Sequence, residues 1–422
     1  MMRGGVGTLT RLENGLRTEM FSLGRELLEL LLNDPNLPVP HDHPHDGERP
    51  AGRHRRDLFT DFGRVRVEKR TYYHNAQTRT GRFPLDEALR LFHGATPAFA
   101  QRATRAVARE PYEKACENLR REGLHEVTPD LLKGLCRALA PDAARFMRSP
   151  PLEKPRSHIP CVVTEADGTT APMRRGELGG VKGRAPDGVA KGREVKLAVQ
   201  YEARVTPGQK PARVDGSTRF LATLEKKDVF GGLVRNDHLR AYPNPPLLHL
   251  FLGDGAPWIW ELRRTQFPNA VEILDFYHAA LHLEPLLDAW GEEGAQRLAR
   301  REEWKALLRA GQVDELIALC SARCAGGDAG CVEAMDKALG YYRANRFRMR
   351  YDEYLSKGWP IGSGVVEGGC KSVICERFKR SGMFWSSEGL EGLLPFRAAL
   401  QAGRFDKLWG FLMDTKQKAM TA

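Results

Sequence analysis

The chain has 422 residues, enough for two to four folding units and a buried core. Apolar residues make up 41% of it, which excludes a largely disordered chain, and its apolar runs fall short of the roughly 20 residues that span a bilayer. Its 65 Lys and Arg against 54 Asp and Glu give a net charge of +11, which favours a polyanionic partner such as nucleic acid.

The eight cysteines indicate a reducing compartment, because no signal peptide precedes them. No pair has the C-x-x-C spacing of a zinc site. Cys320, Cys324 and Cys331 form the only cluster, and it lacks a fourth ligand, so we do not favour a metal there. We therefore expect a soluble, cytoplasmic protein.

Residues 1–95 are predicted to hold a helix, a linker and a basic hairpin. Leu at helical spacing between Met20 and Leu32 predicts an amphipathic helix for packing or dimerisation. The connector 34–56 contains four His that could suggest a metal, but its prolines and its lack of Cys favour a mobile polar linker. Alternation from Leu58 to Tyr73 predicts a β-hairpin whose basic face either binds phosphates or is simply solvated.

Residues 96–150 are predicted to be a helical region that binds DNA. Two helices, Pro111–Gly123 and Thr128–Leu139, are joined by a turn, and Thr128 with Pro129 makes a good helix start. Helix-turn-helix geometry places a second helix in the major groove, although helical hairpins also occur without this role. Ser149–Pro155 is a linker.

Residues 156–290 alternate strands with helices and predict the first part of an α/β core. Residues 291–355 predict an all-helical insertion, and residues 356–422 the last part of the core with C-terminal helices. The expected elements of the first part are a strand from Ile159 to Glu165 that ends at Asp167, a basic loop from Lys182 to Arg193, a strand from Glu194 to Val205, a helical stretch over 218–240, a strand from Leu247 to Leu252 that ends at Asp254, a short helix around 257–265 and a strand from Ala270 to Leu274.

Three acids stand in settings that otherwise avoid charge. Asp167 and Asp254 each follow a predicted strand and precede Gly, where α/β proteins collect functional groups. Glu367 lies in Gly362-Ser-Gly-Val-Val-Glu-Gly, on a predicted helix capped by Ser363. Three converging carboxylates would repel one another unless hard cations lay between them, and oxygen ligands suit Mg²⁺ or Mn²⁺. Alternatively, the two Asp-Gly pairs are ordinary turns and Glu367 pairs with Lys371.

Three stretches resemble the DDE-type transposases of bacterial insertion sequences, in the ISKra group of the mutator-like branch. They are Asp254-Gly-Ala-Pro-Trp-Ile-Trp260, Asp275-Phe-Tyr-His278, and Gly362–Glu367 together with Arg380-Ser-Gly-Met-Phe-Trp385. The resemblance covers roughly residues 58–410. It implies an RNase H-like catalytic fold with a helical insertion before the final acid.

The resemblance implies that Asp167, Asp254 and Glu367 are the metal-binding catalytic acids and hold two ions. Asp275 and His278 match an acid-x-x-His element of the family, with a catalytic or a structural role. Glu165 is an alternative to Asp167. Family members often carry Cys pairs near the N-terminus, and their absence here predicts a zinc-free variant.

The resemblance also implies double-stranded DNA, both terminal repeats and target, as partner, a homo-oligomer acting on it, and a nucleoid-associated location. Candidate DNA contacts are Lys182, Arg184, Lys371, Arg377, Lys379, Arg380 and Trp385. Trp258, Trp260 and Trp385 could stack on bases, or lie in the core. The expected activity is metal-dependent cleavage at insertion-sequence ends and transfer of the 3′-hydroxyl into target DNA. The alternatives are a nuclease or resolvase without strand transfer, and an inactive regulator derived from a transposase.

Overall fold

The computed structural model describes residues 6–156, 159–179, 191–324 and 329–421, and it is of the mixed α/β class that the sequence predicts. The chain forms two compact units. Unit 1 comprises Met1–Phe146 with Phe405–Ala422, and unit 2 comprises Met147–Arg404. The break between them falls just before the predicted linker. The C-terminal helix, predicted to accompany the core, belongs to unit 1 instead.

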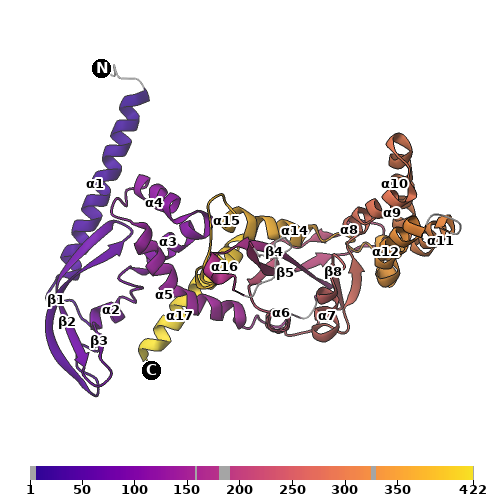
Figure 1. Cartoon of the computed structure of the whole chain (residues 1–422). Coiled ribbons are helices and arrows are strands. Elements are labelled where there is room, and N and C mark those ends of the chain that lie inside the picture. Colours follow the sequence, from indigo (N-terminus) through magenta and orange to yellow (C-terminus); the bar gives the residue numbers. More distant parts are fainter. Residues whose placement is uncertain (1–5, 157–158, 180–190, 325–328, 422) are drawn as a thin grey trace. The chain divides into compact units, whose positions relative to one another are not determined.

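Unit 1 begins with a long helix on an antiparallel sheet (Figure 1). The predicted hairpin is confirmed, but its first strand starts at Glu48 because Asn75 and His74 pair with Glu48 and Arg49. The prediction of a mobile linker is therefore wrong for residues 48–56. The elements are α1 (Val6–Leu32), β1 (Glu48–Thr60), β2 (Gly63–Asn75) and β3 (Thr80–Arg82).

Five helices complete the described part of unit 1. The two helices predicted between Pro111 and Leu139 are confirmed, and the second continues to Arg148 because Ala143 and Phe146 keep it on the core. The C-terminal helix packs on the same core, with the ring of Phe411 5.5 Å from that of Phe146. The helices are α2 (Pro84–Ala88), α3 (Pro97–Arg109), α4 (Tyr112–Arg121), α5 (Pro129–Arg148) and α17 (Phe405–Thr421).

A mixed sheet forms the centre of unit 2. Its order is β6-β5-β4-β8-β9, and β7 also pairs with β5. β4 runs antiparallel to β5 and parallel to β8, which is parallel to β9. The strands are β4 (Cys161–Pro172), β5 (Gly192–Arg204), β6 (Ala212–Arg213), β7 (Arg219–Thr223), β8 (Leu248–Gly253) and β9 (Val271–Leu274).

Two strand predictions need correction. β4 does not end at Asp167 but continues to Pro172, because β5 pairs with it along its whole second half. Residues 219–223 were expected in a helix and form β7. All five of these residues are buried, and a short buried run shows no alternation that would separate strand from helix.

Helices cover both faces of the sheet of unit 2 (Figure 1). On one face α6 (Lys227–Ala241) packs, and the backbone carbonyl of its Val234 accepts a hydrogen bond from Gln200 of β5. On the other face lies a continuous helical stretch made of α14 (Gly364–Gly369), a π-helical segment (Cys370–Cys375) and α15 (Glu376–Phe378). The remaining helices around the sheet are α7 (Pro257–Gln266), α8 (Phe276–Leu281), α16 (Ser387–Gln401) and the short 3-10 turn Arg175–Glu177.

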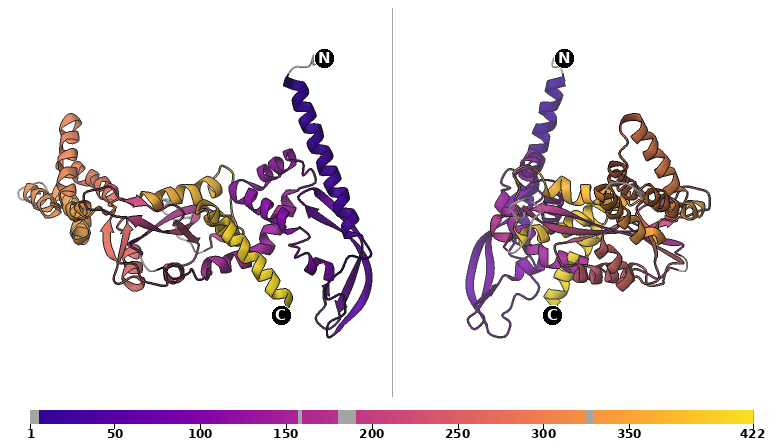
Figure 2. Two further views of the ribbon diagram at one scale, coloured as in Figure 1. Left: turned by 180° about the vertical axis from the view of Figure 1, so that it is seen from behind. Right: turned by 45° about the vertical axis from the view of Figure 1, so that its right-hand side comes forward.

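The stretch predicted as a helical insertion is helical over its described residues. It separates β9 and α8 from α14, and Trp304 is buried in it against the ring of Trp290 at 5.2 Å. Its helices are α9 (Leu283–Trp290), α10 (Gly294–Arg309), α11 (Val313–Cys324), α12 (Ala329–Asn345), the 3-10 turn Arg346–Arg348 and α13 (Tyr351–Ser356). Figure 2 shows this block as a bundle at the end of unit 2 where β8 and β9 lie. Across the described ranges, no helix is long and apolar enough to cross a membrane.

Candidate functional site

Strand register brings three predicted acids to one level of the sheet. β4 and β8 pair in parallel with Glu165 opposite Leu252, and β8 pairs with β9 with Gly253 opposite Leu274. Continuing the first register by two residues places Asp167 opposite Asp254. Continuing the second register by one residue places Asp254 opposite Asp275. Neighbouring strands lie about 4.8 Å apart. Residues at the same level of parallel strands also project to the same side of the sheet, so Asp167 and Asp254 share a face.

Asp167 lies inside β4 and faces the long helical stretch on that side of the sheet. One of its carboxylate oxygens accepts a hydrogen bond from the backbone N–H of Gly168 at 2.6 Å. The thiol of Cys370, in the π-helical segment, donates to the other at 3.4 Å. Single π-helical turns inside helices occur often at functional sites. Asp167 is therefore half-buried between the sheet and the helix that carries Glu367.

Asp254 follows β8 directly, as the sequence predicts. Its carboxylate accepts a hydrogen bond from the backbone N–H of Ala256 at 2.8 Å, which starts the turn into α7. Its carbonyl oxygen accepts one from the hydroxyl of Tyr341 at 3.0 Å. Gly255 has φ of +103°, a conformation that favours Gly. Tyr341 belongs to α12, so the helical insertion helps to fix the loop that holds Asp254.

Asp275 is fully buried and joins two segments. One carboxylate oxygen accepts a hydrogen bond from the backbone N–H of His278 at 2.6 Å and so caps the start of α8. The other accepts hydrogen bonds from the backbone N–H and, at 2.7 Å, the hydroxyl of Ser363. This bonding favours the structural alternative for Asp275. It also shows that the hydroxyl of Ser363, expected to cap α14, is used to hold Asp275 instead.

Glu367 lies one turn into α14 and is exposed. The start of α14 is held by Glu165, whose carboxylate accepts a hydrogen bond from the backbone N–H of Val366 at 2.8 Å. Glu165 also accepts one from the hydroxyl of Tyr201 at 2.7 Å. It has no exposed surface, so it supports the site without facing it, and Asp167 is the better candidate. The predicted alternative, an ion pair between Glu367 and Lys371, is not formed between these two described residues.

Electrostatic effects show that the five candidate catalytic residues lie near one another. Burial raises the pKa of Asp167, and the negative charge of Asp254 raises it further while His278 lowers it. Burial also raises the pKa of Glu367, with Asp275 and Asp167 adding to the rise and His278 opposing it. Burial raises the pKa of the neighbouring Glu165 to about 7. The site is thus a cluster of acids with one imidazole beside it.

The donor set of this cluster suits a hard divalent cation, because the three predicted metal ligands all offer carboxylate oxygens. Burial is the largest cause of the raised pKa values of Asp167 and Glu367, and the neighbouring acids add to it. As they lie, no three His, Cys, Asp or Glu side chains of the described residues are grouped closely enough to hold a metal ion.

The candidate DNA contacts have different environments. Lys371 and Arg380 are exposed, and Lys379 donates a hydrogen bond to the hydroxyl of Thr169 at 2.5 Å. Arg377 has no exposed surface, and its guanidinium lies 5.3 Å from the ring centre of Trp385, so its role as a phosphate contact needs correction. A fully buried guanidinium is a packing element and does not reach a backbone phosphate. Lys182 and Arg184 lie outside the described residues.

The tryptophans have packing roles. The indole N–H of Trp385 donates to the carbonyl of Phe378 at 3.0 Å, and its backbone N–H donates to Pro172 at the end of β4. Trp260 is buried, with the guanidinium of Arg348 4.3 Å from its ring centre. The ring of Trp258 lies 6.0 Å from that of Phe230. These contacts favour the core interpretation over base stacking.

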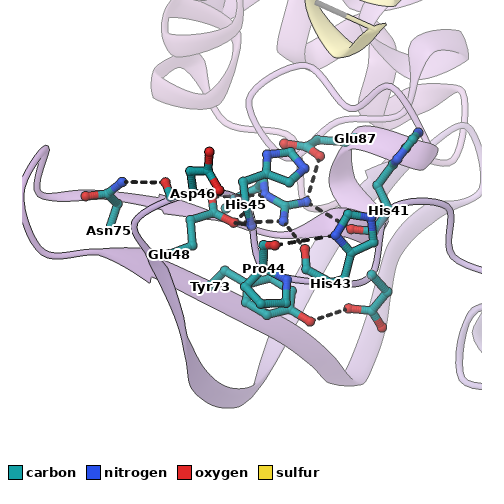
Figure 3. A network of polar contacts seen from close by, with 11 residues as sticks. His41, His43, Pro44, His45, Asp46, Glu48, Tyr73, Asn75 and Glu87 are labelled. Atoms are coloured by element: carbon teal, nitrogen blue, oxygen red, sulfur yellow. Dashed lines mark hydrogen bonds and ion pairs between the residues drawn. The ribbon is translucent and has the colours of Figure 1, made fainter.

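His41, His43 and His45 lie in a network of polar contacts at one end of the hairpin (Figure 3). The guanidinium of Arg82 donates to Glu48 and to the backbone carbonyl of His43 at 2.7 Å. The rings of His43 and His45 lie 5.8 Å apart. These hydrogen bonds hold His43 and Glu48 against Arg82 of β3, so the group has a structural role. Of the cysteine cluster, Cys320 is buried, whereas the side chains of Cys324 and Cys331 lie outside the described residues.

Several supporting residues were not predicted. Glu165 could have been given its role, because it lies two residues before Asp167 on one strand and so shares its face. Cys370 and Tyr341 carry no local pattern that links them to acids about 200 and 90 residues away. Only the packing of the long helix and of the insertion brings them to the site.

Fold and site together define a mixed α/β protein with a carboxylate cluster at the level where its parallel strands end. Within known families, the chain matches the profile of an uncharacterised protein family (UPF0236) over residues 5–409, and it belongs to that family. A search of curated proteins gives no match.

Proposed function

We propose that this protein is a DDE-type transposase that uses Asp167, Asp254 and Glu367 to cut at insertion-sequence ends and to join the freed 3′-hydroxyl to target DNA. The observation that supports this most is the alignment of Asp167 with Asp254 on neighbouring parallel strands, with Glu367 on the helix packed over them. It gathers carboxylates that are 87 and 113 residues apart in the sequence.

The sheet supports an RNase H-like core. Its long antiparallel pair, β4 with β5, is extended by β7 on one side and by the parallel strands β8 and β9 on the other. The first acid lies on the central strand and the second follows the next strand. The third lies on a helix that follows an all-helical insertion, the order that the resemblance implies.

Asp167, Asp254 and Glu367 would hold Mg²⁺ or Mn²⁺, which when bound would activate the attacking oxygen and stabilise the leaving oxygen of a phosphodiester. The chain's own contribution is positional. Asp275 and Glu165 fix the segment that carries Glu367, through Ser363 and Val366. His278 lies where its positive form lowers the pKa of both Asp167 and Glu367, so it moderates the repulsion between them.

A polyanionic substrate fits the charge of the chain, +11 overall. Lys371 is exposed on the helical stretch that carries Glu367, Arg380 is exposed just after that stretch ends, and both would contact phosphates. Each such contact makes binding depend steeply on salt. The exposed strand residues Arg53 and Arg55 of the hairpin offer a second basic surface.

The test is incubation of the full chain with Mg²⁺, pre-cleaved insertion-sequence ends and a supercoiled target plasmid. Joined product supports the transposase. Hydrolysis without joining would point to a nuclease or resolvase. Binding to the ends without either reaction, in Mg²⁺ and in Mn²⁺, would point to an inactive regulator.

A further inference from the structure

The first helix carries apolar side chains on a face that nothing in its own unit covers. Eight of its Leu and Met side chains are between 50% and 70% exposed. Together they present on the order of 800 Å² of surface, the amount that one partner contributes to a standard-size protein interface. They are Leu9, Leu12, Leu16, Met20, Leu23, Leu27, Leu30 and Leu31.

The opposite face of α1 is already used by unit 1. The ring of Phe21 lies 6.0 Å from that of Phe62 in the hairpin turn. Glu29 accepts a hydrogen bond from the backbone N–H of Arg66 at 2.8 Å, and Asn33 accepts one from that of Glu68 at 2.8 Å. These contacts fix the rotation of the helix, so the exposed apolar face points away from the hairpin. Figure 2 shows the N-terminal half of α1 extending beyond the sheet of unit 1.

The spacing of the exposed residues is that of a coiled-coil seam. From Leu9 to Leu30 they recur in steps of three and four residues, the pattern that brings apolar side chains to the contact line between two helices. A helix of 27 residues is about 40 Å long, enough for several turns of contact.

The same pattern is nearly symmetric about its centre. Leu9 and Leu30, Leu12 and Leu27, and Leu16 and Leu23 lie at equal distances from a point between residues 19 and 20, with Met20 beside it. A second copy of the helix running in the opposite direction would therefore place Leu against Leu in three kinds of pair, each formed twice. Such self-complementarity is what a two-fold interface requires.

We propose that α1 forms an antiparallel coiled coil with α1 of a second copy of this chain. The interface consists of the eight exposed residues, and it is independent of the carboxylate site. Antiparallel pairing also opposes the helix dipoles, which favours this direction.

The experiment is sedimentation equilibrium of the full chain and four variants. We expect a dimer for the wild-type chain and for the control Leu298→Glu, a substitution at a 63% exposed Leu of α10. Leu9→Glu and Leu30→Lys should each raise the dimer Kd by about tenfold or more, because each places an unpaired charge against a Leu of the partner at both ends of the interface. The double variant should dimerise more tightly than either single variant, because each Glu then faces a Lys of the partner.

Circular dichroism and thermal unfolding serve as the folding check, since side chains exposed in the monomer are not needed to fold it. A wild-type chain that stays monomeric at concentrations on the order of 100 µM, where even weak dimers form, would overturn the proposal. So would dimers that neither single substitution weakens. A double variant that dimerises more weakly than both single variants would show parallel pairing and contradict the antiparallel interface.

Discussion

Four acids near the ends of the parallel strands of unit 2 differ in burial, and Asp275 and Glu165 have no exposed surface. Asp275 and Glu165 each accept bonds at both oxygens from fixed donors, among them Ser363, Val366 and Tyr201. Asp167 is half-buried and Glu367 is exposed, and burial and neighbouring acids raise the pKa of both. The first two hold the segment that carries Glu367, and we propose that the other two bind the ligand.

Neutralising Asp167 should stabilise the metal-free protein. Burial and repulsion raise the pKa of Asp167 in the folded protein, so the free energy of unfolding decreases as pH rises through that pKa. At pH 8 the ionised carboxylate therefore opposes folding. We expect Asp167→Asn to raise the unfolding temperature in EDTA and to remove any further rise caused by Mg²⁺ or Mn²⁺. Asp228→Asn, at an exposed acid of α6, should do neither. An Asp167→Asn chain that Mn²⁺ still stabilises as much as the wild type would contradict this assignment.

The local sequence points to the candidate acids more readily than to the residues that form hydrogen bonds with them. Asp254 and Glu367 are recognisable because each is a lone charge next to Gly in an apolar setting. Asp167 was expected at the end of a strand, but the strand continues past it. Whether Asp275 is structural could not be decided before the structure showed its bonds to Ser363.

Among elements, the helical stretch that carries Glu367 lies unusually close to the sheet. A Cβ at Gly369 would come within 2.6 Å of the ring of Phe220 and 2.9 Å of Leu197, whereas one at Gly368 would meet nothing within 4 Å. The close approach lets Cys370 reach Asp167 and places Glu367 over the strands. The geometry of the site therefore depends on a glycine that takes no part in its chemistry.

We expect Gly369→Ala to lower the free energy of unfolding by roughly 1–3 kcal/mol, the cost of forcing an extra methyl group into a packed contact. The matched control Gly368→Ala should be neutral or slightly stabilising, because Ala is the better helix former. Urea unfolding of the two variants measures the difference. Equal stability of both variants would show that the helix can move away from the sheet at no cost.

A histidine pair on the opposite face of the sheet makes unit 2 sensitive to acid. The rings of His238 on α6 and His249 on β8 stack 4.6 Å apart, and His249 shares a hydrogen bond with Thr164 of β4 at 2.9 Å. Burial lowers the pKa of His238 to about 4 and that of His249 to about 3. Both stay neutral in the fold, while in the unfolded chain they take up protons below about pH 6.5.

Stability should therefore fall as pH drops below 6.5. For His238 alone the shift corresponds to roughly 2 kcal/mol at pH 5. His238→Phe, which keeps a ring without a titratable group, should reduce the difference between urea midpoints at pH 7.5 and pH 5. The exposed His41→Gln should leave that difference unchanged. A His238→Phe protein with the acid sensitivity of the wild type would rule out this origin.

At the scale of the whole molecule, the C-terminal helix α17 belongs to unit 1, the unit that also contains the N-terminal elements. Trp409 of α17 packs on Phe92 at 5.5 Å between ring centres, and Asp406 forms an ion pair with Arg105. A chain that stops after Arg404 should lose stability in unit 1 and leave unit 2 intact. Limited proteolysis should then cut within residues 6–146 and spare 191–324. A chain cut first in the second range would show that α17 supports unit 2.

The sequence predicts the order of this architecture well: a hairpin, a helical region, an α/β core and a helical insertion. It misses β7 and the return of α17, because neither leaves a local pattern. A five-residue buried strand looks like a helix segment, and the amphipathic C-terminal helix does not indicate which core it covers. Such assignments depend on contacts between distant residues.

The most direct test of the central claim compares Glu367→Gln with the control Glu302→Gln, at a 69% exposed side chain of α10. Cleavage and joining of insertion-sequence ends in Mg²⁺ are measured beside binding of the same DNA. We predict that Glu367→Gln binds DNA as the wild type does but neither cuts nor joins it, while Glu302→Gln does both. Retained cleavage by Glu367→Gln would contradict the assignment of Glu367 as the third catalytic carboxylate.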